Sequence, residues 1–199
     1  ALVFNAILIF AGNQKISTMI HPIALRNGLI ATGIVVAYTI VAYLVGVKLF
    51  TNWWIAIILM IGILVYYILS VKNIRKAKGG FISFGDAFVQ FIVMSAMYIV
   101  ISTLFMYILI WVIDPDFGQA YVDASLEKII GMMEGFGAPD VAIEEAIAEA
   151  EVDFEKQKSL GGTVLNMLGP LGGFAIVGLI VAAVLKKNPP VFEETETID

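Results

Sequence analysis

The stretch that decides the fold runs from residue 87 to residue 113 and reads AFVQFIVMSAMYIVISTLFMYILIWVI. It carries no charged residue between Asp86 and Asp114. A helix needs about 20 apolar residues to cross the roughly 30 Å hydrocarbon core of a bilayer. An isolated segment in lipid must also satisfy its own backbone hydrogen bonds, which favours a helix over a strand. We therefore predict that this stretch is a membrane-spanning helix.

Three further stretches have the same uncharged, apolar character. They are residues 29–47, 53–71 and 163–185. The loop between the third and fourth stretches, residues 114–160, is long and acidic, and its apolar residues recur at helical spacing. The predicted fold class is an all-α membrane protein with four transmembrane helices and an extramembrane acidic helical hairpin between the third and the fourth.

The overall composition excludes several classes of protein. Hydrophobic residues make up 60% of the chain and charged residues only 15%. In an ordinary soluble domain about a quarter of the residues are charged. The net charge of −5 disfavours nucleic-acid binding, which requires clustered lysine and arginine. The chain has no cysteine and one histidine, so disulfides, thiol catalysis and Cys-ligated or His-rich metal sites are excluded.

The distribution of basic residues predicts the orientation. With four spans, both chain ends and the link 72–86 share one side of the membrane. That side holds Lys15, Arg26, Lys72, Arg75, Lys76, Lys78, Lys186 and Lys187, and the other side holds Lys48, Lys128, Lys156 and Lys158. By the positive-inside rule both termini are expected to be cytoplasmic and the acidic loop to lie outside. Trp53, Trp54 and Trp111 then form an aromatic belt at the outer boundary.

The link between the second and third spans combines a basic cluster with aromatic residues. The cluster Lys72, Arg75, Lys76 and Lys78 is a candidate lipid-headgroup site, although the positive-inside rule alone also explains it. The rings of Phe81, Phe84 and Phe88 would share one face of a helix and offer a docking surface. Because a span counted from Phe81 exceeds the bilayer core, we expect an interfacial entry helix that bends into the membrane near Asp86.

These segments resemble a known family. The runs KNIRK at 72–76 and GGFISFGDAF at 79–88, with Asp114-Pro115, the acidic loop and Lys186-Lys187, resemble the signature of domain of unknown function 4199. The resemblance covers about residues 22–190. It implies a four-span inner-membrane protein of Gram-negative bacteria, mainly Bacteroidetes. The family has no assigned reaction, so it implies no catalytic residue.

The acidic loop reads as two amphipathic helices joined by the turn GFGAP at 135–139. Its second half is crowded with carboxylates, namely Glu144, Glu145, Glu149, Glu151, Asp153 and Glu155. Such a run indicates either a solvated outer face or a docking surface for a basic partner. The ligand set of a calcium loop is absent.

The last span is rich in glycine. Gly169 and Gly173 have the small-xxx-small spacing that lets a second helix approach closely, and Gly178 continues the pattern. A helix that began only after Pro170 would be too short to cross the bilayer, so the span must be kinked or broken at Pro170. This break near Asn166 indicates either a substrate site, as in transporters, or a tightly packed structural helix.

Few residues remain that carry chemistry. Asp86 and Asn166 are the candidates for a polar site, although Asp86 also fits a helix cap. We identify no catalytic residue, no metal ligand and no cofactor. The predicted partners are membrane lipid and either another membrane protein or a second copy of the chain. Residues 1–22 are expected to lie at the interface or to belong to a fifth span, and residues 188–199 to form a disordered tail.

The sequence therefore favours a non-enzymatic inner-membrane accessory subunit that packs against a larger envelope complex. The alternative is a small transporter or channel. It would be an oligomer, because four helices alone leave little room for a pore. A membrane enzyme acting on lipid or peptide is least favoured, because catalytic groups are scarce.

Overall fold

The computed structural model of the chain describes residues 20–189, and within them the regular structure is helical apart from one isolated β-bridge. Four segments are long and apolar enough to cross a membrane: Pro22–Val45, Trp53–Ala77, Phe84–Ile113 and Leu160–Leu185. The four predicted spans are confirmed as helices of that length and composition. The predictions for residues 1–19 and 190–199 lie outside the described residues.

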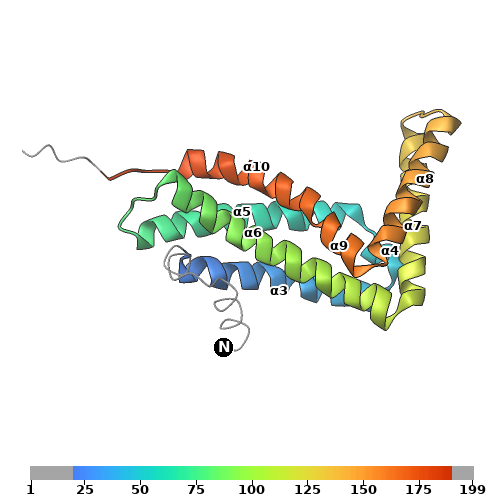
Figure 1. Cartoon of the computed structure of the whole chain (residues 1–199), viewed down its shortest axis with the longest axis horizontal. Coiled ribbons are helices and arrows are strands. Elements are labelled where there is room, and N and C mark those ends of the chain that lie inside the picture. Colours follow the sequence, from blue (N-terminus) through green and yellow to red (C-terminus); the bar gives the residue numbers. More distant parts are fainter. Residues whose placement is uncertain (1–19, 190–199) are drawn as a thin grey trace, which may run out of the picture.

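The helices form a bundle with a second layer across one end (Figure 1). The bundle contains α3 (Pro22–Val45), α5 (Trp53–Ala77), α6 (Phe84–Tyr107) with the π-helix η1 (Ile108–Ile113), and the pair α9 (Leu160–Asn166) and α10 (Leu168–Leu185). The short helix α4 (Val47–Phe50) connects α3 to α5 and packs on α7 (Pro115–Gly135), which forms the second layer together with α8 (Asp140–Gln157). The helices α7 and α8 pack side by side.

The outer surface of the bundle is apolar, as expected for a chain solvated by lipid. Leu44 is 76% exposed, Val184 74% and Ile58 66%. By contrast, the rings of Tyr67 and Phe91 are fully buried between the helices. Exposed apolar side chains over four neighbouring helices exceed the small patches of a water-soluble monomer, so the bilayer is the natural solvent for this surface.

Helix α6 lies at the centre of the bundle and packs on α3, α5 and α10. Gly28 of α3 allows close approach, because a Cβ there would lie 3.3 Å from the Met94 Cα. Hydrogen bonds reinforce the packing: the Tyr67 hydroxyl donates to the Met94 carbonyl over 3.0 Å, and the Asn27 amide donates to the Ser70 hydroxyl over 2.9 Å. Small residues and polar bonds between helices are the usual means of association in lipid, where a hydrophobic driving force is missing.

Helix α3 begins earlier than the uncharged stretch indicated. Pro22 occupies its first turn, and the His21 Nδ1 accepts a hydrogen bond from the Ile23 amide over 3.2 Å. A cap together with a proline in the first turn favours initiation at this point. The polar residue Asn27 therefore lies inside the helix, where its side-chain amide donates a hydrogen bond to the Ser70 hydroxyl.

The predicted entry helix with its bend near Asp86 is wrong. Helix α6 begins at Phe84, because the Ser83 hydroxyl caps it by accepting a hydrogen bond from the Asp86 amide over 3.1 Å. Phe81 precedes this cap and lies outside the helix, so the predicted face of aromatic rings does not include it. The neighbouring Ile82 forms a β-bridge with Lys187 through two backbone hydrogen bonds, each of 2.9 Å.

Asp114 sits at the corner where the bundle meets α7. One of its carboxylate oxygens accepts from the Phe117 amide over 2.9 Å, and the other accepts from the Tyr43 hydroxyl over 2.7 Å. These two hydrogen bonds hold the pKa of the Asp114 carboxyl below its usual value, the one from the Phe117 amide having the larger effect. Asp114 thus both caps α7 and joins it to α3.

The predicted interruption of the last span is confirmed, and it lies at Met167, between α9 and α10. Pro170 has no amide hydrogen to donate to the Asn166 carbonyl, and its ring crowds that carbonyl. The helical bonding pattern therefore fails one turn before the proline.

Candidate functional site

The basic cluster of the α5–α6 link is divided between two roles. The Arg75 guanidinium donates to the Leu185 carbonyl over 3.1 Å and so closes the end of α10. The Lys78 ammonium pairs with the Asp86 carboxylate at 3.0 Å. Lys72 and Lys76 are exposed at the surface. Lys78 is exposed too but is paired, so Lys72 and Lys76 are the exposed members of the predicted lipid-headgroup site that form no ion pair within the described residues.

Asp86 and Asn166 do not form one polar site. Asp86 lies in the first turn of α6, whereas Asn166 ends α9 near the opposite end of the bundle (Figure 1). Asp86 is engaged with Lys78, and the side chain of Asn166 is exposed. Sequence proximity to Pro170 singled out Asn166, but the fold turns it away from the bundle.

The glycines of α10 fall on two different faces. Gly178 faces the bundle, where a Cβ would lie 2.8 Å from the Phe91 ring and 3.4 Å from the Phe88 ring. The other face, which we call the open α10 face, consists of Gly169, Gly173, Ile176 and Ile180. Among the residues that the structure describes, a Cβ on Gly169 or Gly173 would meet no atom of another element within 4 Å, and Ile176 and Ile180 are 64% and 61% exposed. Of the predicted packing residues, Gly178 and Phe88 therefore serve contacts within the chain.

The predicted aromatic docking surface is reduced to Phe84, which is 40% exposed. Its ring stacks on Phe88, with ring centroids 6.5 Å apart and planes 2° apart. Pro170 is exposed beside Gly169 at the start of α10. Among the described residues, no group of three or more His, Cys, Asp or Glu side chains is arranged to hold a metal ion.

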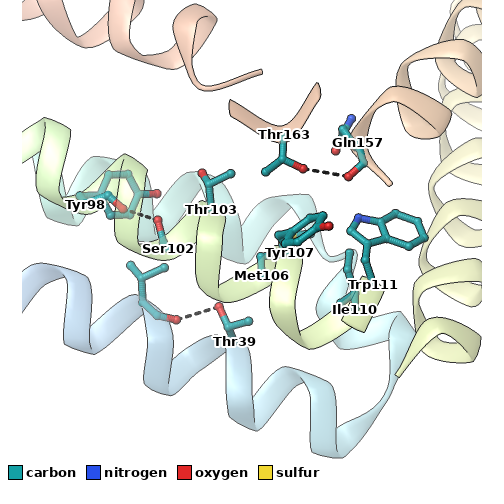
Figure 2. Close-up of a pocket in the computed structure, with 11 residues that line it drawn as sticks. Thr39, Tyr98, Ser102, Thr103, Met106, Tyr107, Ile110, Trp111, Gln157 and Thr163 are labelled. Atoms are coloured by element: carbon teal, nitrogen blue, oxygen red, sulfur yellow. Dashed lines mark hydrogen bonds between the residues drawn. The ribbon is translucent and has the colours of Figure 1, made fainter. Parts of the chain in front are cut away.

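A cavity of about 250 Å³ lies where the bundle meets the α7–α8 layer, and sequence reasoning did not find it. Figure 2 shows its lining, contributed by α3, α6, η1, α8 and α9. Eight of the eleven lining residues carry a polar side-chain group and none is charged, although most of the surface that they expose to the cavity is apolar. The lining residues are Val35, Thr39, Tyr98, Ser102, Thr103, Met106, Tyr107, Ile110, Trp111, Gln157 and Thr163.

Three hydroxyls of this lining are bound to backbone carbonyls. Thr39 donates to Val35 over 2.9 Å, Ser102 donates to Tyr98, and Thr163 donates to Gln157 over 2.8 Å (Figure 2). Such bonds occupy the hydroxyl hydrogen and leave the oxygen lone pairs available to accept. The three residues thus present acceptors to the cavity.

Other polar groups of the lining make no hydrogen bond within the part of the chain that the structure describes. They are the hydroxyls of Tyr98, Thr103 and Tyr107, the indole N–H of Trp111 and the side-chain amide of Gln157. The cavity therefore combines unused donors with unused acceptors, all of them neutral.

The sequence held one signal for this cavity. Thr103, Tyr107 and Trp111 follow at intervals of four residues and so share one face of the third span. Hydroxyl residues in spans are readily explained by bonds to their own helix, which is correct for Thr39 and Ser102. That explanation does not apply to Thr103 or Tyr107. No sequence pattern indicated that Gln157 of α8 and Thr163 of α9 would join them.

Comparison with known proteins identifies the family but no activity. No curated protein and no solved structure matches the chain. The model of a family described as "Protein of unknown function (DUF4199)" matches residues 26–187, which include all of the four spans except the first turn of α3. The chain therefore belongs to the DUF4199 family.

Proposed function

We propose that this protein is a non-enzymatic accessory subunit of the bacterial inner membrane, and that it packs against a larger envelope complex through the open α10 face. The observation that carries the proposal is the position of Gly169 and Gly173, where an added Cβ would meet no other element among residues 20–189. The partner is a helix of another membrane protein or of a second copy.

A glycine in the middle of a helix lowers helix stability by about 1 kcal/mol relative to alanine. Gly178 has a reason within the chain, because the Phe91 ring occupies the space of a side chain. Gly169 and Gly173 have no such contact within the described part of the chain, yet their spacing suits the close approach of a second backbone. The flanking Ile176 and Ile180 would extend the contact along the helix.

The first test is substitution on this face. We expect Gly173→Leu, and likewise Gly169→Leu, to abolish copurification of a stoichiometric membrane partner after gentle detergent extraction, because the leucine side chain holds the two backbones apart. Mass spectrometry of the purified material measures the loss. The thermal unfolding temperature should not fall, since neither site contacts another element.

Gly33→Leu and Gly62→Leu are the matched controls for this test. Both glycines lie exposed in other spans with no atom of another element within 4 Å, so both variants should retain the partner. Purification of the wild-type chain as a lone monomer, or an unchanged partner in both α10 variants, would refute the proposal.

We also propose that both termini face the cytoplasm and that α7 and α8 lie in the periplasm. The distribution of charge supports this orientation. The Ile82–Lys187 bridge joins the basic α5–α6 link to the end of α10, and the start of α3 lies at the same end of the bundle (Figure 1). The acidic α8 stands at the other end, and lysine and arginine favour the cytoplasmic side.

Single cysteines test this orientation without background labelling, because the chain has no cysteine of its own. Glu145 in α8 and Lys76 at the end of α5 are both exposed. In spheroplasts, a membrane-impermeant maleimide should label Glu145→Cys at once and Lys76→Cys only after the inner membrane is permeabilised. Labelling of both positions from the same side would overturn the orientation.

A small oligomeric transporter or channel is a second candidate, and the neutral polar cavity is the observation that favours it. Solute flux in liposomes that carry the purified protein would distinguish this function from the accessory role.

A further inference from the structure

We propose that the cavity bounded by Thr103, Tyr107, Trp111, Gln157 and Thr163 is a binding site for an uncharged group that carries several hydroxyls. A free polyol or sugar and the sugar headgroup of a lipid share this chemistry. The cavity is separate from the open α10 face. An experiment that refutes the binding site can therefore be distinguished from one that refutes the accessory role.

The hydrogen-bonding inventory points to hydroxyl groups as the ligand. The Trp111 indole supplies a donor alone, the Thr103 and Tyr107 hydroxyls supply donors and acceptors, and the Gln157 amide supplies both. Thr39, Ser102 and Thr163 add acceptor lone pairs. A molecule that presents only donors or only acceptors would leave part of this set unpaired, whereas each hydroxyl of a polyol both donates and accepts.

The charge of the lining excludes an ionic ligand. None of the lining residues carries a charge. The ammonium of Lys158 lies 5.8 Å from the centre of the Trp111 ring, outside the lining. Because Lys158 is already paired with the Glu155 carboxylate, an ion moved from water into this site would lose hydration without gaining an unpaired counter-charge, which is unfavourable.

The dimensions limit the ligand to a small group. At about 250 Å³ the cavity falls just below the range of roughly 300–1,000 Å³ that is typical of pockets for drug-sized molecules. Three aromatic side chains, Tyr98, Tyr107 and Trp111, form part of its wall (Figure 2). Their rings provide an apolar surface for the C–H faces of a ring-shaped polyol, and polar groups around apolar walls are the usual composition of a small-molecule site.

The backbone around the cavity is irregular on two sides, which supports binding over mere packing. The π-helix η1 contributes Ile110 and Trp111, and α9, which contributes Thr163, ends at the break at Met167. Single π-helical turns occur often at functional sites. In membrane proteins, interrupted helices are tolerated where they are covered by protein or line a cavity.

The test uses Trp111 as its own reporter. In the background Trp53→Phe/Trp54→Phe, Trp111 is the single tryptophan of the full chain, since the sequence has three. We expect glucose, myo-inositol or glycerol to produce a saturable change in Trp111 fluorescence in detergent solution, and glucose 6-phosphate to produce none. A parallel titration uses phosphatidylcholine nanodiscs with and without a monoglucosyl diacylglycerol. A response to the glycolipid alone identifies a lipid headgroup as the source, and a response to the free polyols identifies a soluble ligand.

Variants of the lining separate binding from indirect effects. Thr103→Val and Gln157→Leu should each weaken the saturable response by roughly tenfold, the size expected for one lost hydrogen bond. Thr32→Val is the matched control. Unlike the Thr103 hydroxyl, the Thr32 hydroxyl is bound to a backbone carbonyl, that of Gly28 at 2.8 Å, and Thr32 does not line the cavity, so binding should be unchanged. The melting temperature of each variant is measured alongside.

Three results would overturn the proposal. The first is a fluorescence change that stays linear in concentration for every polyol and for the glycolipid. The second is an equal response to glucose 6-phosphate, because a site without counter-charge should exclude it. The third is wild-type binding in both Thr103→Val and Gln157→Leu.

Discussion

Replacing Gly118 by alanine is expected to unfold the corner between the bundle and α7. A Cβ at this position would lie 2.2 Å from the Ile110 carbonyl oxygen and 3.0 Å from the Trp111 ring. The first of these atoms belongs to the backbone of η1 and cannot rotate away, so either η1 or the start of α7 must shift. Overpacking of this kind destabilises by roughly 1–3 kcal/mol and occasionally more, and we expect the upper end of this range or beyond.

The matched control for Gly118→Ala is Gly131→Ala in the same helix. Gly131 has no atom of another element near its Cβ position, so alanine there should stabilise α7 by up to about 1 kcal/mol through helix propensity. The two variants therefore differ in sign. Thermal unfolding of the detergent-solubilised protein, followed by circular dichroism, measures both. Equal melting temperatures would show that the corner is looser than the structure indicates.

Gly178→Ala is the second large effect that we expect, because it introduces a methyl group into the centre of the bundle. The new Cβ would lie 2.8 Å from a ring carbon of Phe91. That ring is fully buried, and it is held by edge contact with Tyr67 at 6.0 Å and by Phe174 at 6.4 Å between centroids. We expect a loss of roughly 1–3 kcal/mol in stability, whereas Gly173→Ala on the open α10 face should cause none.

A double variant shows whether the effect arises from the Phe91 contact. Phe91→Leu alone should destabilise the bundle, because it removes buried ring atoms. In the double variant Phe91→Leu/Gly178→Ala, the new methyl group enters the vacated space, and the combined loss should be smaller than the sum of the single losses by about 0.5–3 kcal/mol. Additive losses would indicate that Gly178 acts through helix α10 itself and not through Phe91.

The two α10 glycines also show where sequence reasoning stops. Gly173 and Gly178 are chemically identical and lie in the same apolar helix, so nothing in the linear order separates a contact within the chain from a surface left open. Only the rotation of α10 against α6 places Gly178 on Phe91 and Gly173 away from every other element. The small-xxx-small pattern predicted close packing, but the fold decides which glycine packs within the chain.

The prediction for the start of α6 was wrong for a related reason. The spacing of Phe81, Phe84 and Phe88 is compatible with one helical face, and helical periodicity extends it past the true end of the helix. The cap at Ser83 is a local feature that the sequence contains. The bridge from Ile82 to Lys187, by contrast, joins residues more than a hundred positions apart, and no local pattern predicts it.

The sequence by itself determined the four spans and the break before Pro170. These features follow from the length of apolar chain that lipid demands and from the missing amide hydrogen of proline, both of which act locally. Only the tertiary structure decided the neutral cavity, the corner at Gly118 and the division of the basic cluster. Each of these depends on side chains from helices that are distant in the chain, and the angle and register at which those helices meet are set by packing.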